Sequence, residues 1–93
     1  MTQKQYIKVT GLNQLIGMRF KSRNSVVGKI FVFKFKKPRR YLDIDTLFIH
    51  YPIRVKLYYQ DVVIKSFIMK PYSLKICDGI FDMMTEEEAS FYG

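Results

Sequence analysis

Two side chains of the kinds that act as nucleophile or general base occur once each in this chain. His50 is the only histidine and Cys77 the only cysteine. A histidine is the base of a Ser-His-Asp triad, but the neighbours of His50 are apolar and no Gly-x-Ser-x-Gly motif is present. A lone cysteine in strand-like sequence is typical of a small packed hydrophobe. A structural zinc site needs four Cys or His ligands, so neither a metal nor a cofactor is expected.

Asp43 and Asp45 are two residues apart in sequence of β type, so their carboxylates project to one face. Such a pair can raise one pKa for acid–base work or share a cation. Arg39 and Arg40 come just before them, which favours a plain ion-pair cluster. The glycines do not add a nucleotide fingerprint, because their spacing is too wide for one. These glycines are Gly11, Gly17 and Gly28.

Basic side chains interleaved with tyrosines form the other pattern with a chemical meaning. Basic grooves follow phosphates and aromatic rings stack on bases, so this pattern is typical of a surface for single-stranded RNA or DNA. The candidate polyanion-binding residues are Lys34, Lys36, Lys37, Arg39, Arg40, Arg54 and Lys56, with Tyr51 and Tyr58 expected to be exposed beside them. Solvated lysines on strand faces are the plainer interpretation of the same residues.

Charge is distributed unevenly along the chain. The net charge is +8, all 16 Lys and Arg residues lie between Lys4 and Lys75, and five of the eight carboxylates lie from Asp78 onward. A basic body of this kind attracts polyanions, and such binding weakens as salt is added.

The length of 93 residues predicts a single small domain over residues 1–93. Hydrophobic residues make up 48% of the chain, enough for a packed core, and one cysteine cannot form an internal disulfide. No secretory segment and no run of about 20 apolar residues is seen. A soluble, cytoplasmic protein with no membrane contact is therefore expected.

The elements that position these residues read as strands. Alternation of apolar and polar residues predicts strands over 5–10, 26–36, 41–51, 53–59, 62–69 and 76–83. In the second of these, Phe31, Phe33 and Phe35 share the face that should enter the core. The fold class is therefore mainly β, as an antiparallel, barrel-like meander with one or two short helices.

Residues that interrupt the strand pattern predict where the chain turns. Pro38 and its charged neighbours predict a turn, Pro52 a bend or sheet edge, Gln60-Asp61 a hairpin, and Pro71 the end of a strand. Near-helical spacing from Gly11 to Phe20 predicts one or two helical turns, and residues 22–25 read as a loop. Thr85-Glu86-Glu87-Glu88 has the spacing of a capping box, which predicts a short helix from Glu86 toward Tyr92.

The order of these motifs resembles the prokaryotic family known as domain of unknown function 192. Its Gly-Leu-Met-Phe-Arg-like signature is similar to 17–21 here, its apolar strand to 29–33, its Phe-Pro-Ile-Asp stretch to 47–55, and its Lys-Pro turn to 69–72. The likeness spans Gly17 to Gly93. It implies a β-rich, barrel-like fold and no established activity.

Three departures from the family pattern stand out. Arg54 replaces the usual acid after Pro-Ile, Asp45 stands where archaeal-type members tend to have His, and the sequence ends at Gly93 where the family continues into another strand. A missing strand would leave a sheet edge open, and open edges invite strand addition. A homodimer or a protein partner is therefore expected at that edge.

Three functions remain open on the sequence. The first is a non-catalytic binding or interaction module with a protein partner, and the second is salt-dependent binding of single-stranded nucleic acid. The third is an enzyme with a cavity lined by Asp43, Asp45, His50 and tyrosines, whose spacing gives no sign of convergence.

Overall fold

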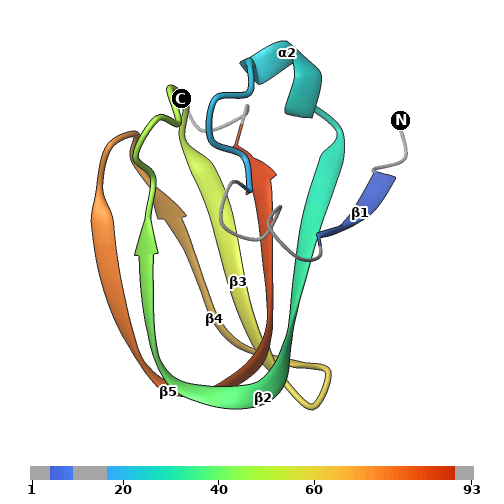
Figure 1. Ribbon diagram of the computed structural model, residues 1–93, viewed down its shortest axis with the longest axis vertical. Helices are drawn as coiled ribbons and strands as arrows, with labels where there is room; N and C mark the ends of the chain where they lie inside the picture. Colours follow the sequence, from blue (N-terminus) through green and yellow to red (C-terminus); the bar gives the residue numbers. More distant parts are fainter. Residues whose placement is uncertain (1–4, 10–16, 90–93) are drawn as a thin grey trace.

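The computed structural model describes residues 5–9 and 17–89, of which most lie in one curved five-stranded sheet (Figure 1). The order across the sheet is β1-β2-β5-β3-β4. β1 is parallel to β2, and the other neighbours are antiparallel. The strands are β1 (Gln5–Val9), β2 (Lys29–Asp45), β3 (Ile53–Tyr59), β4 (Val62–Met69) and β5 (Leu74–Glu88). The mainly β prediction is confirmed, and the curved sheet is consistent with a barrel-like fold, although the sheet does not close. The predicted antiparallel meander is wrong in two respects, because β1 is parallel to β2 and β5 lies between β2 and β3.

Two long, bent strands give the sheet its curvature. β2 and β5 both run down the molecule, bend at the bottom of Figure 1 and return upward beside each other. Their pairing shifts register between Lys34 and Tyr41, where the strands bend. Gly79 lies in the bend of β5 at φ 142°, and a Cβ there would come within 2.7 Å of the Phe81 ring. Only glycine fits that close approach.

The core fills the inside of the curved sheet. Phe31 and Phe33 of β2 are buried, as are Val55 and Leu57 of β3, which have no exposed surface. Period-two alternation points these side chains to one face of each strand, so the predicted Phe face is confirmed. Phe81 of β5 is fully buried and belongs to the same core cluster.

The predicted hairpin joins β3 to β4. Gln60 and Asp61 form a two-residue loop, and both have positive φ, at 50° and 66°. This is the conformation of a type I′ turn, whose twist matches the twist of the flanking strands. The bend at Pro52 and the end of β4 before Pro71 are also as predicted.

Several local predictions are wrong. The turn predicted at Pro38 is a bend within β2 and does not separate two strands, because β2 continues through the charged segment. The strand expected over 41–51 ends at Asp45, since Thr46 leaves the sheet. The expected loop over 22–25 contains α2 (Arg23–Val26), a single helical turn. Of the helix expected over 11–20, residues 11–16 lie outside the described part and 17–20 form a turn.

The capping box is the most instructive error. Thr85 and the three glutamates after it lie in β5, where they pair with β2 and β3. Pairing on both sides outweighs a local capping preference, because backbone groups of this segment gain hydrogen-bonding partners on β2 and β3. The rest of the expected helix, from Ser90 on, lies outside the described residues.

Over residues 5–9 and 17–89, no helix has both the length and the apolar composition needed to cross a membrane. In the described sheet β1 and β4 are the two end strands, each hydrogen-bonded to one neighbour.

Candidate nucleic-acid interface

The register of the sheet aligns basic side chains across its outer face. Lys8 of β1 is opposite Val32, Val32 is opposite Thr85, and Thr85 is opposite Lys56 of β3. Partners in register project to the same side of a sheet, about 4.8 Å apart from strand to strand. One cross-strand row therefore carries a lysine on β1 and another on β3, and it ends at Ser66 of β4.

The adjacent rows add further charges and two aromatic rings. In the strand register, Lys34 and Tyr58 both lie opposite Met83, and Arg54 lies opposite Glu87. Tyr6 lies opposite Ile30 at the end strand and is 70% exposed. We call this surface the basic face, defined by Tyr6, Lys8, Lys34, Arg54, Lys56 and Tyr58.

The electrostatic balance of the basic face is positive. Its four cations are opposed, among the described residues of these rows, by the single carboxylate of Glu87. Lys8 and Lys34 are exposed, and Arg54 and Lys56 are half-buried. Long basic side chains lay their methylenes on the sheet and keep the charged end in water.

The Tyr58 side chain reaches the neighbouring strand β5. The Thr85 hydroxyl donates to the Tyr58 hydroxyl oxygen at 3.5 Å, and both residues are at least half-buried. The half-buried Tyr58 is therefore anchored at its hydroxyl end beside Thr85 on the outer face of the sheet.

The structure separates the nine predicted residues into three groups. Lys34, Arg54, Lys56 and Tyr58 share the basic face. A second group lies exposed along the bend of β2, comprising Lys36, Lys37, Arg39 and Arg40. Within it, the Arg39 guanidinium lies 4.7 Å above the Phe35 ring.

Tyr51 forms the third group, and its predicted exposure is wrong. It is 3% exposed, and its hydroxyl donates to the carbonyl oxygens of Met18 and Lys21. Burial, with the charges of Glu88 and Glu86, raises the pKa of Tyr51 to about 12. Pro52 ends the strand pattern just after it, so Tyr51 packs inward from a bend and not outward from a strand.

Tyr6 and Lys8 belong to the basic face but were not among the predicted site residues. The alternation in 5–10 does place them on one side of a strand. What it cannot give is the partner of that strand, because a parallel pairing with β2 leaves no local turn signal.

The candidate catalytic groups do not converge. His50 is exposed, and the Tyr72 hydroxyl lies 3.4 Å from either of its ring nitrogens. Cys77 is free and buried on β5. Among the residues described, no group of three or more His, Cys, Asp or Glu could hold a metal ion.

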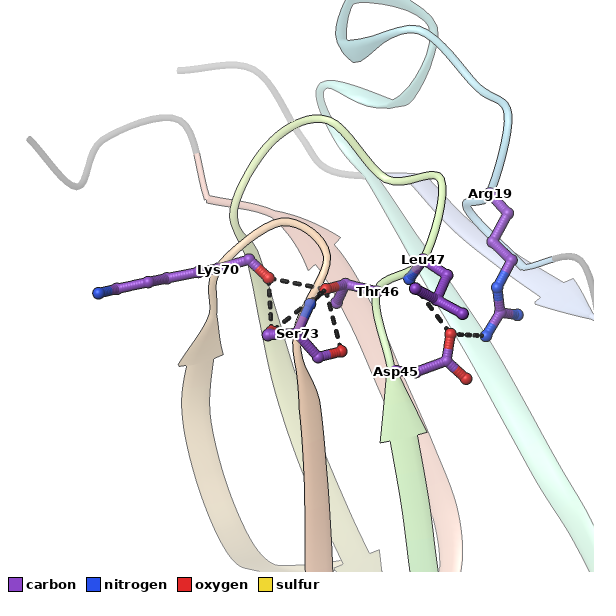
Figure 2. Close-up of polar contacts among 6 residues, drawn as sticks. All are labelled: Arg19, Asp45, Thr46, Leu47, Lys70 and Ser73. Carbon is purple, nitrogen blue, oxygen red and sulfur yellow. Dashed lines mark hydrogen bonds and ion pairs between the residues drawn. The ribbon is translucent and has the colours of Figure 1, made fainter.

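Asp45 forms an ion pair, as expected, but with a different arginine. Figure 2 shows its carboxylate between the Arg19 guanidinium and the Leu47 N–H. Burial raises the pKa of Asp45, but the Arg19 and Leu47 hydrogen bonds and the Arg19 charge together hold it below its usual value. A strongly paired carboxylate of this kind is a structural contact and a poor general base.

Next to this pair, Thr46 closes the loop that leaves β2 (Figure 2). Its fully buried hydroxyl donates to the Lys70 carbonyl at 2.7 Å and accepts from the Ser73 N–H at 2.7 Å. The same residue thus ties the end of β2 to the start of β5.

No family model, no curated protein and no solved structure with which the chain was compared matches it.

Proposed function

We propose that this protein binds single-stranded nucleic acid through the basic face. The observation that carries the proposal is the register, which gathers cations from β1, β2 and β3 on one surface together with Tyr6 and Tyr58. In the sequence, these residues are spread over more than fifty positions.

Each component of the face has a role in such binding. Cations spaced along rows neutralise successive phosphates and release their counterions. Exposed tyrosine rings stack on bases, which contributes about 1–3 kcal/mol per base without demanding a particular sequence. The open sheet also leaves the surface wide enough for unpaired bases, which a duplex keeps inside its stack.

Fluorescence anisotropy with a labelled oligonucleotide of about 20 nucleotides tests the proposal. If the four cations each neutralise one phosphate, the slope of log affinity against log salt is about −3. Affinity should then fall about 50-fold between about 50 and 200 mM salt. A duplex of the same length is the control and should bind more weakly. Negligible binding at the lowest salt would contradict the proposal.

A second candidate is a homodimer formed at the edge of β4. This end strand carries one charge, Lys65, in eight residues, so two copies can pair without like-charge repulsion. Its exposed apolar side chains would be covered by the pairing; they are Val62, Val63, Ile64 and Ile68. Edge strands with such composition favour strand addition.

Light scattering during size-exclusion chromatography separates a dimer from a monomer. The variant Ile64→Lys should shift a wild-type dimer to monomer, because edge lysines oppose pairing. If the wild type is a monomer at high concentration, the dimer proposal is wrong. That result would not affect the proposal that the basic face binds nucleic acid.

An intracellular, cytoplasmic setting is part of the same proposal, supported by Cys77, which is free and buried. The resemblance to domain of unknown function 192 stays a prediction, and the basic face supports binding without it. Finding the native protein only in an extracellular fraction would contradict this setting.

A further inference from the structure

Three exposed aromatic side chains form a cluster on segments that are far apart in the sequence. Phe20 ends the turn that begins at Gly17, Phe48 lies between β2 and β3, and Tyr72 lies in the turn between β4 and β5. These segments lie in the upper half of Figure 1, away from the hairpin that joins β3 to β4. The three side chains are 71%, 47% and 51% exposed, respectively. We call Phe20, Phe48 and Tyr72 the aromatic cluster.

The rings of the aromatic cluster contact one another. Phe20 and Phe48 are stacked, with ring centroids 4.8 Å apart and planes 22° from parallel. Tyr72 meets Phe48 edge to face at 6.2 Å, and on its other side it meets His50 at 5.3 Å. Aromatic pairs favour these arrangements. Phe20 stands at the end of this row, and most of its surface is left in solvent.

Backbone hydrogen bonds join the three segments. The Phe20 N–H donates to the Phe48 carbonyl at 3.1 Å, and the Tyr72 N–H donates to the Thr46 carbonyl at 3.1 Å. The Ile49 N–H donates to the same Thr46 oxygen. The rings are therefore positioned by a connected framework before a ligand arrives, which lowers the cost of ordering them on binding.

All three residues of the aromatic cluster have a left-handed backbone. The φ angle is 64° at Phe20, 62° at Phe48 and 52° at Tyr72. Bulky residues rarely adopt positive φ, and such strain gathers at sites that hold ligands. Over residues 5–9 and 17–89, the other non-glycine residues with positive φ are Gln60 and Asp61, which the type I′ turn explains. The positive φ angles that no hairpin explains thus all belong to the aromatic cluster.

The segments that carry the aromatic cluster have no acidic side chain. Residues 17–23, 46–52 and 70–73 contain neither Asp nor Glu. Asp45, which precedes the second segment, is paired with Arg19. A ligand that carries phosphates therefore meets no carboxylate on these segments, and like charges do not oppose its approach.

The aromatic cluster is also close to the basic face. The segment with Phe48 leads directly into β3, whose Arg54 belongs to the basic face. Six residues of fully extended chain span at most about 20 Å, so Phe48 is no farther than this from Arg54. Arg54 and Tyr6 share a row of the register, through Glu87 and Ile30. This row is the one at the start of β3, so a strand on the basic face can continue from it onto the aromatic cluster.

We propose that the aromatic cluster is a base-stacking site for the single-stranded nucleic acid that the basic face binds, with one base lying on the Phe20 ring. This inference rests on the proposed function and gives the two surfaces different roles. The basic face neutralises phosphates, and the aromatic cluster receives a base. Stacking of this kind accepts any base, because every base has a flat π surface.

A strand without bases separates stacking from phosphate contacts. The probes are a labelled single strand of about 20 nucleotides and a strand of equal length whose sugars carry no bases. We expect Phe20→Gly to weaken binding of the first strand about ten-fold and to leave binding of the second unchanged. The slope of log affinity against log salt should stay the same, because no phosphate contact is lost.

Glycine is chosen at Phe20 because it adopts positive φ without steric cost, so removal of the ring adds no backbone strain. Gln60→Gly is the matched control, since it makes the same backbone change at φ 50° in the hairpin, and it should leave both affinities unchanged. Phe20→Tyr keeps a ring and should bind as the wild type does. If thermal melting shows that Phe20→Gly does not fold, Tyr72→Gly makes the same test from the turn between β4 and β5.

The outcomes distinguish this inference from the proposed function. If the wild type binds neither strand, the proposed function fails, and the inference fails with it. If the wild type binds both strands and Phe20→Gly weakens both equally, or neither, the inference alone is overturned. The aromatic cluster would then be left for a protein partner.

Discussion

Arg19 and Asp45 form an ion pair in the lining of a cavity that Glu86 also lines, and they act on the Glu86 carboxyl group in opposite directions. The Arg19 charge stabilises the carboxylate, while the Asp45 charge destabilises it. The pair therefore couples a surface contact to the ionisation of a buried group.

Removing either partner should move the titration of Glu86, with opposite signs. Arg19→Met is expected to raise the pKa of Glu86 above its wild-type value, and Asp45→Asn to lower it. Titration of the side-chain carboxyl carbons by NMR measures both. Shifts in the same direction for the two variants would show that structural rearrangement outweighs the charges.

Glu86 should also make stability depend on pH. Burial raises its folded pKa to about 7, above the ordinary 4.5, so its contribution is full below pH 4.5 and is lost as pH rises through about 7. The loss corresponds to about 3 kcal/mol of the free energy of unfolding.

The side chain of the Glu86→Gln variant cannot ionise, so the free energy of unfolding of this variant should not fall in the same way as pH rises. Urea unfolding from about pH 5 to pH 8 measures the difference between the variant and the wild type. Parallel curves for the two proteins would place the ionisation of Glu86 outside this range.

Thr46→Val should lower the free energy of unfolding by about 2 kcal/mol, since it leaves the half-buried Ser73 N–H without the acceptor that the fully buried Thr46 side chain provides. Thr46→Ser keeps the hydroxyl and loses one methyl group, about 0.8 kcal/mol. Chemical unfolding of the three proteins should give wild type above Thr46→Ser above Thr46→Val. A valine variant as stable as the serine variant would show that the hydroxyl bonds contribute little.

Charge reversal on the basic face should weaken nucleic-acid binding and its salt dependence together. Lys34→Glu with Lys56→Glu removes two proposed phosphate contacts, so the log–log salt slope should become shallower by about 1.4. The control reverses Lys21 and Lys70, which are exposed and lie off the basic face. Equal losses for both pairs, measured by anisotropy, would mean that net charge alone governs binding.

Stacking is tested separately from charge with two equally exposed tyrosines. Tyr6 and Tyr41 are each 70% exposed, but only Tyr6 lies on the basic face. Tyr6→Ala should weaken oligonucleotide binding by about ten-fold at fixed salt, while Tyr41→Ala should not. Thermal melting of each variant checks that the fold is kept.

Period-two alternation carried most of the strand prediction. It placed the Phe31 and Phe33 face in the core and separated Val55 and Leu57 from Arg54 and Lys56, because strand side chains alternate whatever the partner. The Gln60-Asp61 hairpin was equally predictable, since a two-residue loop allows few conformations.

The errors occur where a local signal competed with a distant partner. Thr85 to Glu88 has a helix-capping spacing, yet hydrogen bonds from both β2 and β3 draw it into the sheet. Pro38 and its charges suggested a turn between two strands, yet β2 bends there and continues as one strand paired with β5.

The amino-acid sequence by itself determined the β class, the core faces and the surplus of positive charge. Only the tertiary structure decided that β1 pairs with β2, which completes the basic face with Tyr6 and Lys8, and that Glu86 points into a cavity beside Arg19. The physical reason is that alternation is set within each strand, whereas register between strands depends on packing over the whole sheet. A side chain's face can be read locally, but its neighbours across the sheet cannot.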